Sequence, residues 1–380
     1  MSEISYPFPV LEFGSTHIRL AIFDKKIINQ SLFYEKKIDF TRNINFELDN
    51  IISGLIIKAE NDLGLHLNEI LLMIDSSSIH SLDFSIKKIY DKKVISNSDI
   101  NYLINECEKD VKFNNEEKEI LQILKYNILL DDNVIEDLEN ISQEASKAIV
   151  ELKFILINKN VCNFLKKLFL KKHITISNIF CISYIKCLGL IKKLEISGYS
   201  SFIDIGLKKS SLIIFKDNKL IYLNNTHIGG DHLTRDISKI LKIDYRTAEA
   251  RKLKFYKNNK LKNVLSENDL LKKIINSRVE EIIEILFLNC PFINTGVFGS
   301  ELKLFLIGNG SRVLNENLLS FGEEFNFISE MSIIDENNKD CCKSAMIFNT
   351  INQKIKPQIQ SVNLENKGFF EKLFGYFSSN

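Results

Sequence analysis

The sequence lacks three features that would define its class at once. It has no excess charge of one sign, because 50 basic and 49 acidic side chains give a formal net charge of +1. It has no uninterrupted apolar run of about 18 residues, which a membrane-spanning helix needs. Its N-terminal segment, "MSEISYPFPV", has no basic region followed by an apolar one, so it does not read as a signal peptide. We expect a cytosolic protein without a global field for nucleic acid, and one that can still lie on a membrane surface.

The seven cysteines also lack the paired spacing of a metal site. Cys181 and Cys187 are isolated, and Cys341 and Cys342 are adjacent. This distribution favours reduced, structural thiols over a zinc site.

The 380 residues are enough for two domains with a smaller insert. The apolar spacing alternates between strand-like and helix-like segments. Strands and tight turns are expected within 9–37, including a turn at Asp24, and a buried strand at 69–75. Helices are expected at 46–63 and from Ser96 onward, where the polar segment begins with capping residues. Strand-then-helix units are expected at 148–169 and 174–193.

Two hairpins of one design occur about 190 residues apart. The stretches "LEFGSTHIRLAIFDKKII" and "IDIGLKKSSLIIFKDNKLI" share a strand, a carboxylate, one residue, a glycine, a polar turn and an apolar return strand. Glu12 and Asp204 occupy the acidic position, and Gly14 and Gly206 the glycine position. The repetition predicts a duplicated domain, and the alternative is chance similarity of two short hairpins.

Such a pair of turns can clamp a nucleotide between two domains. Gly14, Ser15 and Thr16 offer backbone N–H groups and hydroxyls to phosphate, and Glu12 and Asp204 can reach Mg²⁺ through water. In the second turn, however, Leu207, Lys208 and Lys209 stand where a phosphate cradle favours glycine and positive φ. Lys208 and Lys209 either bring positive charge to phosphate oxygens or are solvated turn residues.

Three further motifs fit a nucleotide cleft. Gly229 and Gly230 lead into a helix whose N-terminus can face phosphate. Glu249 and Lys252 lie three apart on one helical face, where they either grip a ribose or adenine edge or form a surface ion pair. A buried strand ends in Gly308-Asn309-Gly310-Ser311, a turn that lets the backbone lie against a base. Asn309 tolerates left-handed geometry better than most residues.

In this order, the motifs resemble those of the actin-like ATPase superfamily, and within it FtsA, a bacterial cell-division family. "LEFGST" resembles the first phosphate motif, "FIDIG" the second, "AEARKLK" the Ala-Glu-x-x-Lys helix and "LIGNGS" the adenosine motif. The helix expected at 274–285 resembles the one that precedes the adenosine strand. The insert at 83–163 lies where FtsA carries its distinctive subdomain.

The resemblance implies an α/β actin-like fold with two duplicated domains around a nucleotide cleft. The first domain would comprise 7–82 and 164–198, around the insert at 83–163. The second would comprise 199–345, with its own subdomain at about 230–300. A closing helix and linker would occupy 346–365, and a membrane-targeting helix 366–380.

The resemblance also implies a function in cell division. The protein would be a peripheral protein at the division site, on the cytoplasmic side of the inner membrane. It would anchor the FtsZ ring, self-associate into protofilaments and recruit further division proteins, with ATP and Mg²⁺ as cofactors. Two departures from the family pattern are the altered turn at 207–209 and the crossover 178–190, which has no acidic residue to position an attacking water. We therefore name no catalytic residue and expect weak ATP binding with negligible hydrolysis.

The C-terminal segment predicts a lipid-binding helix. Residues 352–366 have no periodic apolar face, and the chain then ends in "KGFFEKLFGYFSSN", with Lys367 and Lys372 flanking the apolar side chains. One helical stripe would contain Phe369, Phe370, Leu373, Phe374 and Phe377. Each Phe buried in a lipid interface contributes on the order of 1.5–3 kcal/mol. The alternative is a tail that docks on its own body or on another protein.

Two other functions stay open. One is an enzyme that hydrolyses ATP to drive a conformational cycle. The other is a pilus-assembly scaffold of the related PilM type, which is also actin-like but is not expected to end in an amphipathic lipid helix.

Overall fold

The structure is a computed structural model that describes residues 7–24, 29–38, 44–135, 140–259, 268–299, 301–314, 325–337 and 339–355. The predicted membrane-binding residues Phe369, Phe370, Leu373, Phe374 and Phe377 lie outside the described residues, as do Lys25 and Lys26 of the turn expected after Asp24.

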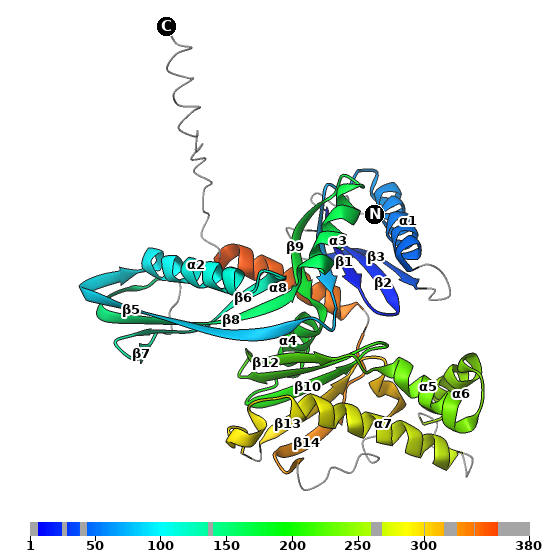
Figure 1. The fold of residues 1–380 in the computed structure, drawn as a ribbon. Coiled ribbons are helices and arrows are strands. Elements are labelled where there is room, and N and C mark those ends of the chain that lie inside the picture. Colours follow the sequence, from blue (N-terminus) through cyan, green and yellow to red (C-terminus); the bar gives the residue numbers. More distant parts are fainter. Residues whose placement is uncertain are drawn as a thin grey trace.

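The first body is built on a five-stranded sheet with the strand order β3-β2-β1-β4-β9. Its strands are β1 (Pro7–Phe13), β2 (His17–Asp24), β3 (Asn29–Lys37), β4 (Glu69–Ile74) and β9 (Thr175–Cys181). The first three strands pair antiparallel, whereas β4 pairs parallel with both β1 and β9. Helices α1 (Ile44–Leu63) and α3 (Lys159–Leu170) belong to the same body (Figure 1). Apolar residues on successive positions of β1 and β2 are buried, as expected of strands covered on both faces.

The second body repeats this design. Its strands are β10 (Tyr199–Ile205), β11 (Ser210–Lys216), β12 (Lys219–Thr226), β13 (Leu302–Ile307) and β14 (Ile328–Ile333), in the order β12-β11-β10-β13-β14. The pattern of antiparallel and parallel pairs matches that of the first sheet. Glu12 lies opposite Arg19, and Asp204 lies opposite Ser211, each acid one residue before the end of its strand. The predicted duplication is confirmed.

Three helices belong to the second body: α5 (Gly230–Leu241), α6 (Tyr245–Asn259) and α7 (Asn268–Leu288). Helix α7 packs on β11 and β12, and α5 packs against both α6 and α7. The helix expected at 274–285 therefore lies inside α7. Its apolar face packs Ile275, Val279 and Ile282 into the core of this body. Two short 3₁₀ turns, Ile293–Thr295 and Ser311–Val313, flank β13.

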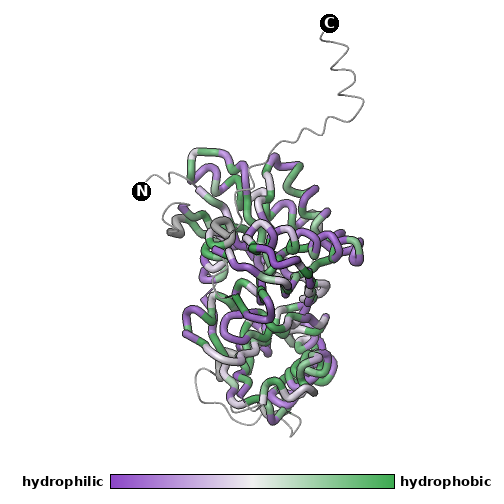
Figure 2. The backbone as a smooth tube through the Cα atoms, turned by 90° about the vertical axis from the view of Figure 1, so that its left-hand side faces the viewer, coloured by the Kyte–Doolittle hydropathy of each residue, from purple (hydrophilic) through white to green (hydrophobic). Residues whose placement is uncertain are grey.

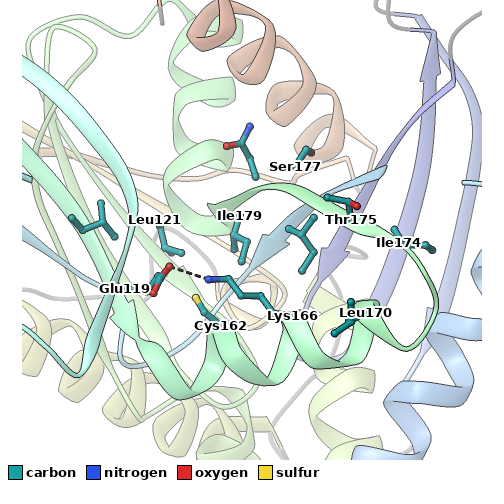
Figure 3. Close-up of a pocket in the computed structure, with 12 residues that line it drawn as sticks. Glu119, Leu121, Cys162, Lys166, Leu170, Ile174, Thr175, Ser177 and Ile179 are labelled. Atoms are coloured by element: carbon teal, nitrogen blue, oxygen red, sulfur yellow. Dashed lines mark hydrogen bonds and ion pairs between the residues drawn. The ribbon is translucent and has the colours of Figure 1, made fainter. Parts of the chain in front are cut away.

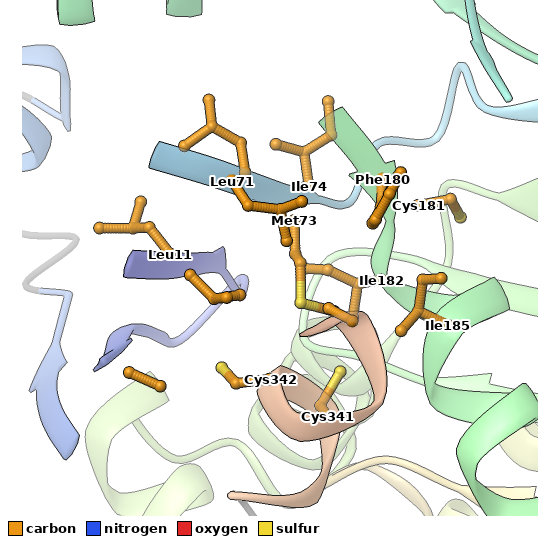
Figure 4. Close-up of a cluster of buried hydrophobic side chains, with 14 of the residues drawn as sticks. Leu11, Leu71, Met73, Ile74, Phe180, Cys181, Ile182, Ile185, Cys341 and Cys342 are labelled. Atoms are coloured by element: carbon orange, nitrogen blue, oxygen red, sulfur yellow. The ribbon is translucent and has the colours of Figure 1, made fainter. Parts of the chain in front are cut away.

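Two helices lie between the bodies. Helix α4 (Ile182–Leu194) follows β9 and contacts both β9 and β11, and α8 (Asp340–Ile355) packs against α4 and β1. Figure 4 shows Cys341 and Cys342 of α8 facing Leu11 and Met73 of the first sheet. The closing helix begins at Asp340 rather than at 346, because Asp340 places a carboxylate in the first turn and its N–H bonds to the Asn337 carbonyl.

The insert forms a third sheet, which extends sideways from the first body (Figure 1). Its order is β5-β8-β6-β7, made by β5 (His80–Ser96), β6 (Lys118–Leu130), β7 (Asn133–Val134) and β8 (Ser142–Asn158). Helix α2 (Asn97–Asn114) packs on this sheet, and Ser96 and Asp99 form a capping box at its start, where the sequence predicted capping residues. The domain boundaries given above stay predictions.

Hydrophobic and hydrophilic residues are interspersed along the chain in both bodies (Figure 2). Within the described ranges, no helix combines the length and apolarity needed to cross a bilayer. All seven cysteines are free and buried. Burial raises the pKa of the Cys181 thiol to about 12 and the pKa of Cys162 to about 11. These thiols therefore stay protonated at neutral pH, in agreement with the structural role predicted for them.

Candidate interdomain cleft

The first turn joins β1 to β2 at Gly14. The Gly14 N–H donates to the His17 carbonyl over 3.0 Å, and a Cβ added at Gly14 would lie 2.8 Å from that same oxygen. Only glycine, which has no Cβ, can lie this close to the His17 carbonyl oxygen. The Thr16 hydroxyl lies 2.9 Å from the His17 Nδ1 atom, and the Thr16 carbonyl accepts from Ile38. Of the three predicted phosphate residues in this turn, Ser15 is the one whose side chain reaches the other body.

The second turn closes without glycine after Gly206. The Gly206 N–H donates to the Lys209 carbonyl over 2.9 Å, and Leu207, Lys208 and Lys209 all have negative φ, so side chains fit at these positions. Lys208 is exposed. The Leu207 N–H donates to the Ser15 hydroxyl over 3.3 Å. The two turns predicted to clamp phosphate therefore touch each other directly.

The N-terminus of α5 faces the carbonyl oxygens of this second turn. The Gly230 N–H donates to the Gly206 carbonyl over 2.8 Å, and the Asp231 N–H donates to the Leu207 carbonyl over 2.7 Å. A Cβ at Gly229 would lie 2.7 Å from the Gly206 oxygen, which explains the first glycine of the pair, whereas a Cβ at Gly230 would lie no closer than 3.5 Å to that oxygen. The helix N-terminal N–H groups that would bind a phosphate therefore donate to carbonyl oxygens of this same chain.

Lys209 points into the protein, whereas its neighbour Lys208 does not. Lys209 is only 8% exposed. Its ammonium lies 2.6 Å from the carboxylate of Asp75, 2.6 Å from the Ser211 hydroxyl and 2.9 Å from the Asn225 amide oxygen. Burial raises the pKa of Asp75, and the Lys209 charge opposes this shift. Lys209 therefore joins the second body to the end of β4 in the first.

A second lysine, Lys186 of α4, forms an ion pair with Asp204, as Lys209 does with Asp75. Its ammonium lies 2.9 Å from Asp204 Oδ2 and 3.2 Å from Glu336 Oε2. Burial favours a higher pKa for Asp204, but the charge and hydrogen bond of Lys186 outweigh it and leave that pKa below its ordinary value. Burial likewise favours a lower pKa for Lys186, and the two carboxylates outweigh it and raise that pKa well above its ordinary value.

Ser183 lies between the two lysine clusters. Its hydroxyl lies 3.4 Å from Asp75 Oδ1, 3.3 Å from Asp204 Oδ2 and 3.2 Å from the Ser211 hydroxyl. We call the group Asp75, Ser183, Lys186, Asp204, Lys209, Ser211, Asn225 and Glu336 the cleft network.

Glu12 is held by the return strand of its own hairpin. Arg19 Nη1 lies 2.5 Å from Glu12 Oε1, and Arg19 Nε lies 2.6 Å from Glu35. Burial raises the pKa of Glu12, which Arg19 only partly offsets. The Cys342 thiol donates to the other Glu12 oxygen over 3.8 Å. The predicted metal-facing carboxylate is thus an ion-pair partner.

Glu249 and Lys252 are an ion pair on α6, with the lysine buried and the glutamate partly exposed. Lys252 is 7% exposed, and its ammonium lies 2.7 Å from Glu249, 2.6 Å from the Thr234 hydroxyl and 3.0 Å from the Gly230 carbonyl. Thr234 also donates to Glu249. The pair joins α6 to the start of α5.

The turn after β13 packs against Asp204 and Ile205. The Gly310 N–H donates to the Ile205 carbonyl over 2.8 Å, and the buried Ser311 hydroxyl donates to the Gly308 carbonyl over 2.8 Å. Left-handed geometry was expected to matter at Asn309, but the positive φ falls on Gly308, at 85°. Asn309 is exposed and has no positive φ, because Gly308 already supplies the reversal.

Sequence reasoning missed most of the cleft network. Asp75 directly follows the buried strand β4, whose carboxyl end meets that of its parallel neighbour β1 at one sheet edge, and this position could have marked it. The crossover has no acid, as noted from the sequence, but it supplies Ser183 and Lys186. Glu336 follows β14 and had no motif to indicate it.

These residues do not fit a magnesium nucleotide held between the two turns. Mg²⁺ requires carboxylate or water oxygens, yet Asp75 and Asp204 each bind a lysine ammonium. Phosphate requires N–H donors, yet those of Leu207, Gly230 and Asp231 bind oxygens of the chain. The assignment of the sequence-predicted residues to a nucleotide stays a prediction.

Two cavities lie outside the two turns. One, of about 460 Å³, lies between β6, α3 and β9, where Lys166 forms an ion pair with Glu119 across 3.0 Å (Figure 3). The other, of about 560 Å³, lies between α4 and α8 and has Lys186 and Glu336 on its wall.

The duplicated sheets, with the hairpins facing each other, define an actin-like ATPase fold. A solved structure of the PilM–PilN type IV pilus biogenesis complex has this fold. It matches with a TM-score of 0.61 at 11% identity and covers 92% of this chain and 99% of that one. The predicted fold class is confirmed.

Sequence comparison is more specific. The family model described as cell division protein FtsA matches residues 201–314. Two curated proteins named cell division protein FtsA, from two strains of Helicobacter pylori, are 26% identical to this chain over 162 residues. That match covers 43% of this chain and 32% of each relative. The predicted resemblance is confirmed: part of this chain is similar to FtsA proteins, and the chain has the actin-like fold.

Proposed function

We propose that this protein anchors FtsZ to the cytoplasmic face of the inner membrane at the division site. The observation that carries the proposal is the match of residues 201–314 to the FtsA family model, which covers the second hairpin, α5, α6, α7 and the turn after β13. Self-association into actin-like protofilaments and recruitment of further division proteins belong to the same proposal. The FtsZ contact is expected in the second body, within about 230–300.

Membrane attachment rests on the sequence of the last residues. The stripe Phe369, Phe370, Leu373, Phe374 and Phe377 would place up to five large apolar side chains in the lipid interface, with binding that depends more on apolar area than on anionic lipid. We expect ATP with Mg²⁺ to bind weakly and to be hydrolysed negligibly. Turnover near one per second or faster, within the range of ordinary enzymes, would favour the ATPase alternative.

The second candidate is a scaffold of the PilM type. It is favoured by the structural match to the PilM–PilN complex, which extends over 92% of this chain. At 11% identity this match concerns the fold alone. Lipid binding by residues 366–380 separates the two candidates, because a PilM-type scaffold is not expected to end in a lipid helix.

Vesicle co-sedimentation tests the proposal. Purified FtsZ from the same cell is mixed with vesicles and either the full-length protein or a variant that ends at Glu365. We expect the full-length protein to carry FtsZ into the pellet and the truncated protein to leave it in solution. Phe374→Asp should act like the truncation, whereas Ser379→Asp, which adds the same charge away from the stripe, should behave like the wild type.

Two other outcomes of the co-sedimentation would each show which part of the proposal is wrong. If the full-length protein pellets and leaves FtsZ in solution, the tail is assigned correctly and the FtsZ contact is wrong. If the protein does not pellet with vesicles, the tail docks on protein, and the PilM-type scaffold becomes the better candidate.

A further inference from the structure

We propose that Lys186 and Lys209 supply, inside the cleft, the positive charge that a metal-bound nucleotide would bring there, so that the two bodies close on each other without nucleotide. The inference does not depend on the division role proposed above. It rests on the direction of the two ion pairs, on their burial, and on the hydrogen bond that joins Leu207 to Ser15 across the two turns.

The two ion pairs cross the cleft in opposite directions. Lys209 stands on the hairpin of the second body and binds Asp75, at the end of β4 in the first. Lys186 stands on α4, which continues from β9 of the first body, and binds Asp204 on the hairpin of the second. Ser183 contacts both carboxylates. Opening the cleft would therefore separate both pairs at once.

The charges nearly cancel within a small buried volume. Three carboxylates, those of Asp75, Asp204 and Glu336, surround two ammonium groups. The side chains of Lys186 and Lys209 are 16% and 9% exposed, so water screens these pairs little. Without the ammonium groups, the closed cleft would hold adjacent carboxylates whose repulsion only another cation could relieve.

Hydrogen bonds between side chains and backbone groups also join the two bodies. Leu207 bonds to Ser15 across the two turns, and the Asn225 amide of β12 donates to the carbonyls of Ser76 and Ile79 in the first body. Since Asn225 also accepts from Lys209, one lysine organises bonds to both bodies. Ion pairs on an exposed surface contribute little to the free energy of unfolding. The Lys186–Asp204 and Lys209–Asp75 pairs differ because each joins one body to the other.

Hydrogen exchange measured by mass spectrometry tests the inference on the intact protein. The peptides of interest contain Leu207, whose N–H bonds across the cleft to Ser15, and its neighbours Gly206, Gly230 and Asp231, whose N–H groups bond within the second body beside it. In the wild type, we expect exchange in EDTA and in millimolar Mg-ATP to agree within about twofold. Lys209→Met, which keeps the length of the side chain and removes its charge, should raise exchange there about tenfold or more, since Asp75, whose side chain is 20% exposed, is left without its cation.

Lys208→Met is the matched control, because Lys208 is the adjacent lysine on the same turn and is exposed. It should leave exchange of these peptides as in the wild type. The inference is overturned if Mg-ATP slows wild-type exchange about tenfold or more, or if Lys209→Met and Lys208→Met exchange alike. The wild-type comparison decides the question even if Lys209→Met fails to fold.

Discussion

Replacing Lys186 by Met is expected to lower the free energy of unfolding by about 3 kcal/mol at neutral pH. The substitution keeps a long side chain but leaves Asp204 and Glu336 facing each other in a buried site without a cation. Breaking a buried pair by removing one partner costs about 3–5 kcal/mol. We expect the lower end, because the Lys186 side chain is 16% exposed. Urea unfolding followed by circular dichroism measures the change.

The matched control is Lys192→Met, on the same helix at an exposed position. It should change the free energy of unfolding by less than about 0.5 kcal/mol. The deficit of Lys186→Met should also shrink on moving from about pH 8 to about pH 5. Without Lys186 the carboxylate pKa values of the folded variant rise, so the folded state takes up protons as the pH falls and is stabilised relative to the wild type. Equal losses for both variants would contradict this account of α4.

Gly308→Ala is expected to cost about 3 kcal/mol or more. Gly308 has φ of 85°, and an added Cβ would lie 2.3 Å from Asp204 Oδ1 and 2.7 Å from the Ile205 carbonyl oxygen. The alanine would bring both the strain of positive φ, about 1 kcal/mol or more, and the cost of overpacking, typically about 1–3 kcal/mol. Thermal or urea unfolding of the purified variant measures the total.

Gly296→Ala separates the two contributions. Gly296 also has positive φ, at 67°, but a Cβ there meets nothing within 4 Å. Its loss should be limited to the backbone strain, about 1 kcal/mol. The difference between the variants then reports the contact of the turn after β13 with Asp204. If the two alanines cost the same, that turn does not pack on Asp204 as described.

The architecture could be predicted from sequence because its signals are local. The two hairpins share a carboxylate, a glycine and an apolar return strand, and the two sheets that contain them share one strand order. Helix α2 begins after capping residues and α5 at a glycine pair, and each signal can be read within one segment, whereas the helix at 274–285, inside α7, was expected from the family resemblance. The start of α8 was missed because "KDCCKS" carries no apolar repeat before the helix proper.

The cleft network could not be predicted because its partners are distant in sequence. Lys209 was weighed as a phosphate ligand or a solvated residue, and neither alternative includes Asp75, which lies in another body. Lys186 lies in the apolar segment "ISYIKCLGL", where a lysine resembles an exposed position on an amphipathic helix. Glu249 and Lys252 were correctly paired by their spacing, but their contact with Gly230 depends on how α6 folds back on α5.

The central claim is that this actin fold closes its cleft with its own charged side chains, and calorimetric titration with Mg-ATP tests it most directly. The account predicts a dissociation constant in the millimolar range or weaker for the wild type, a binding free energy of about −4 kcal/mol at most. A dissociation constant near a micromolar, about −8 kcal/mol, would contradict it. Such tight binding would require Lys186 and Lys209 to leave Asp204 and Asp75 for the nucleotide.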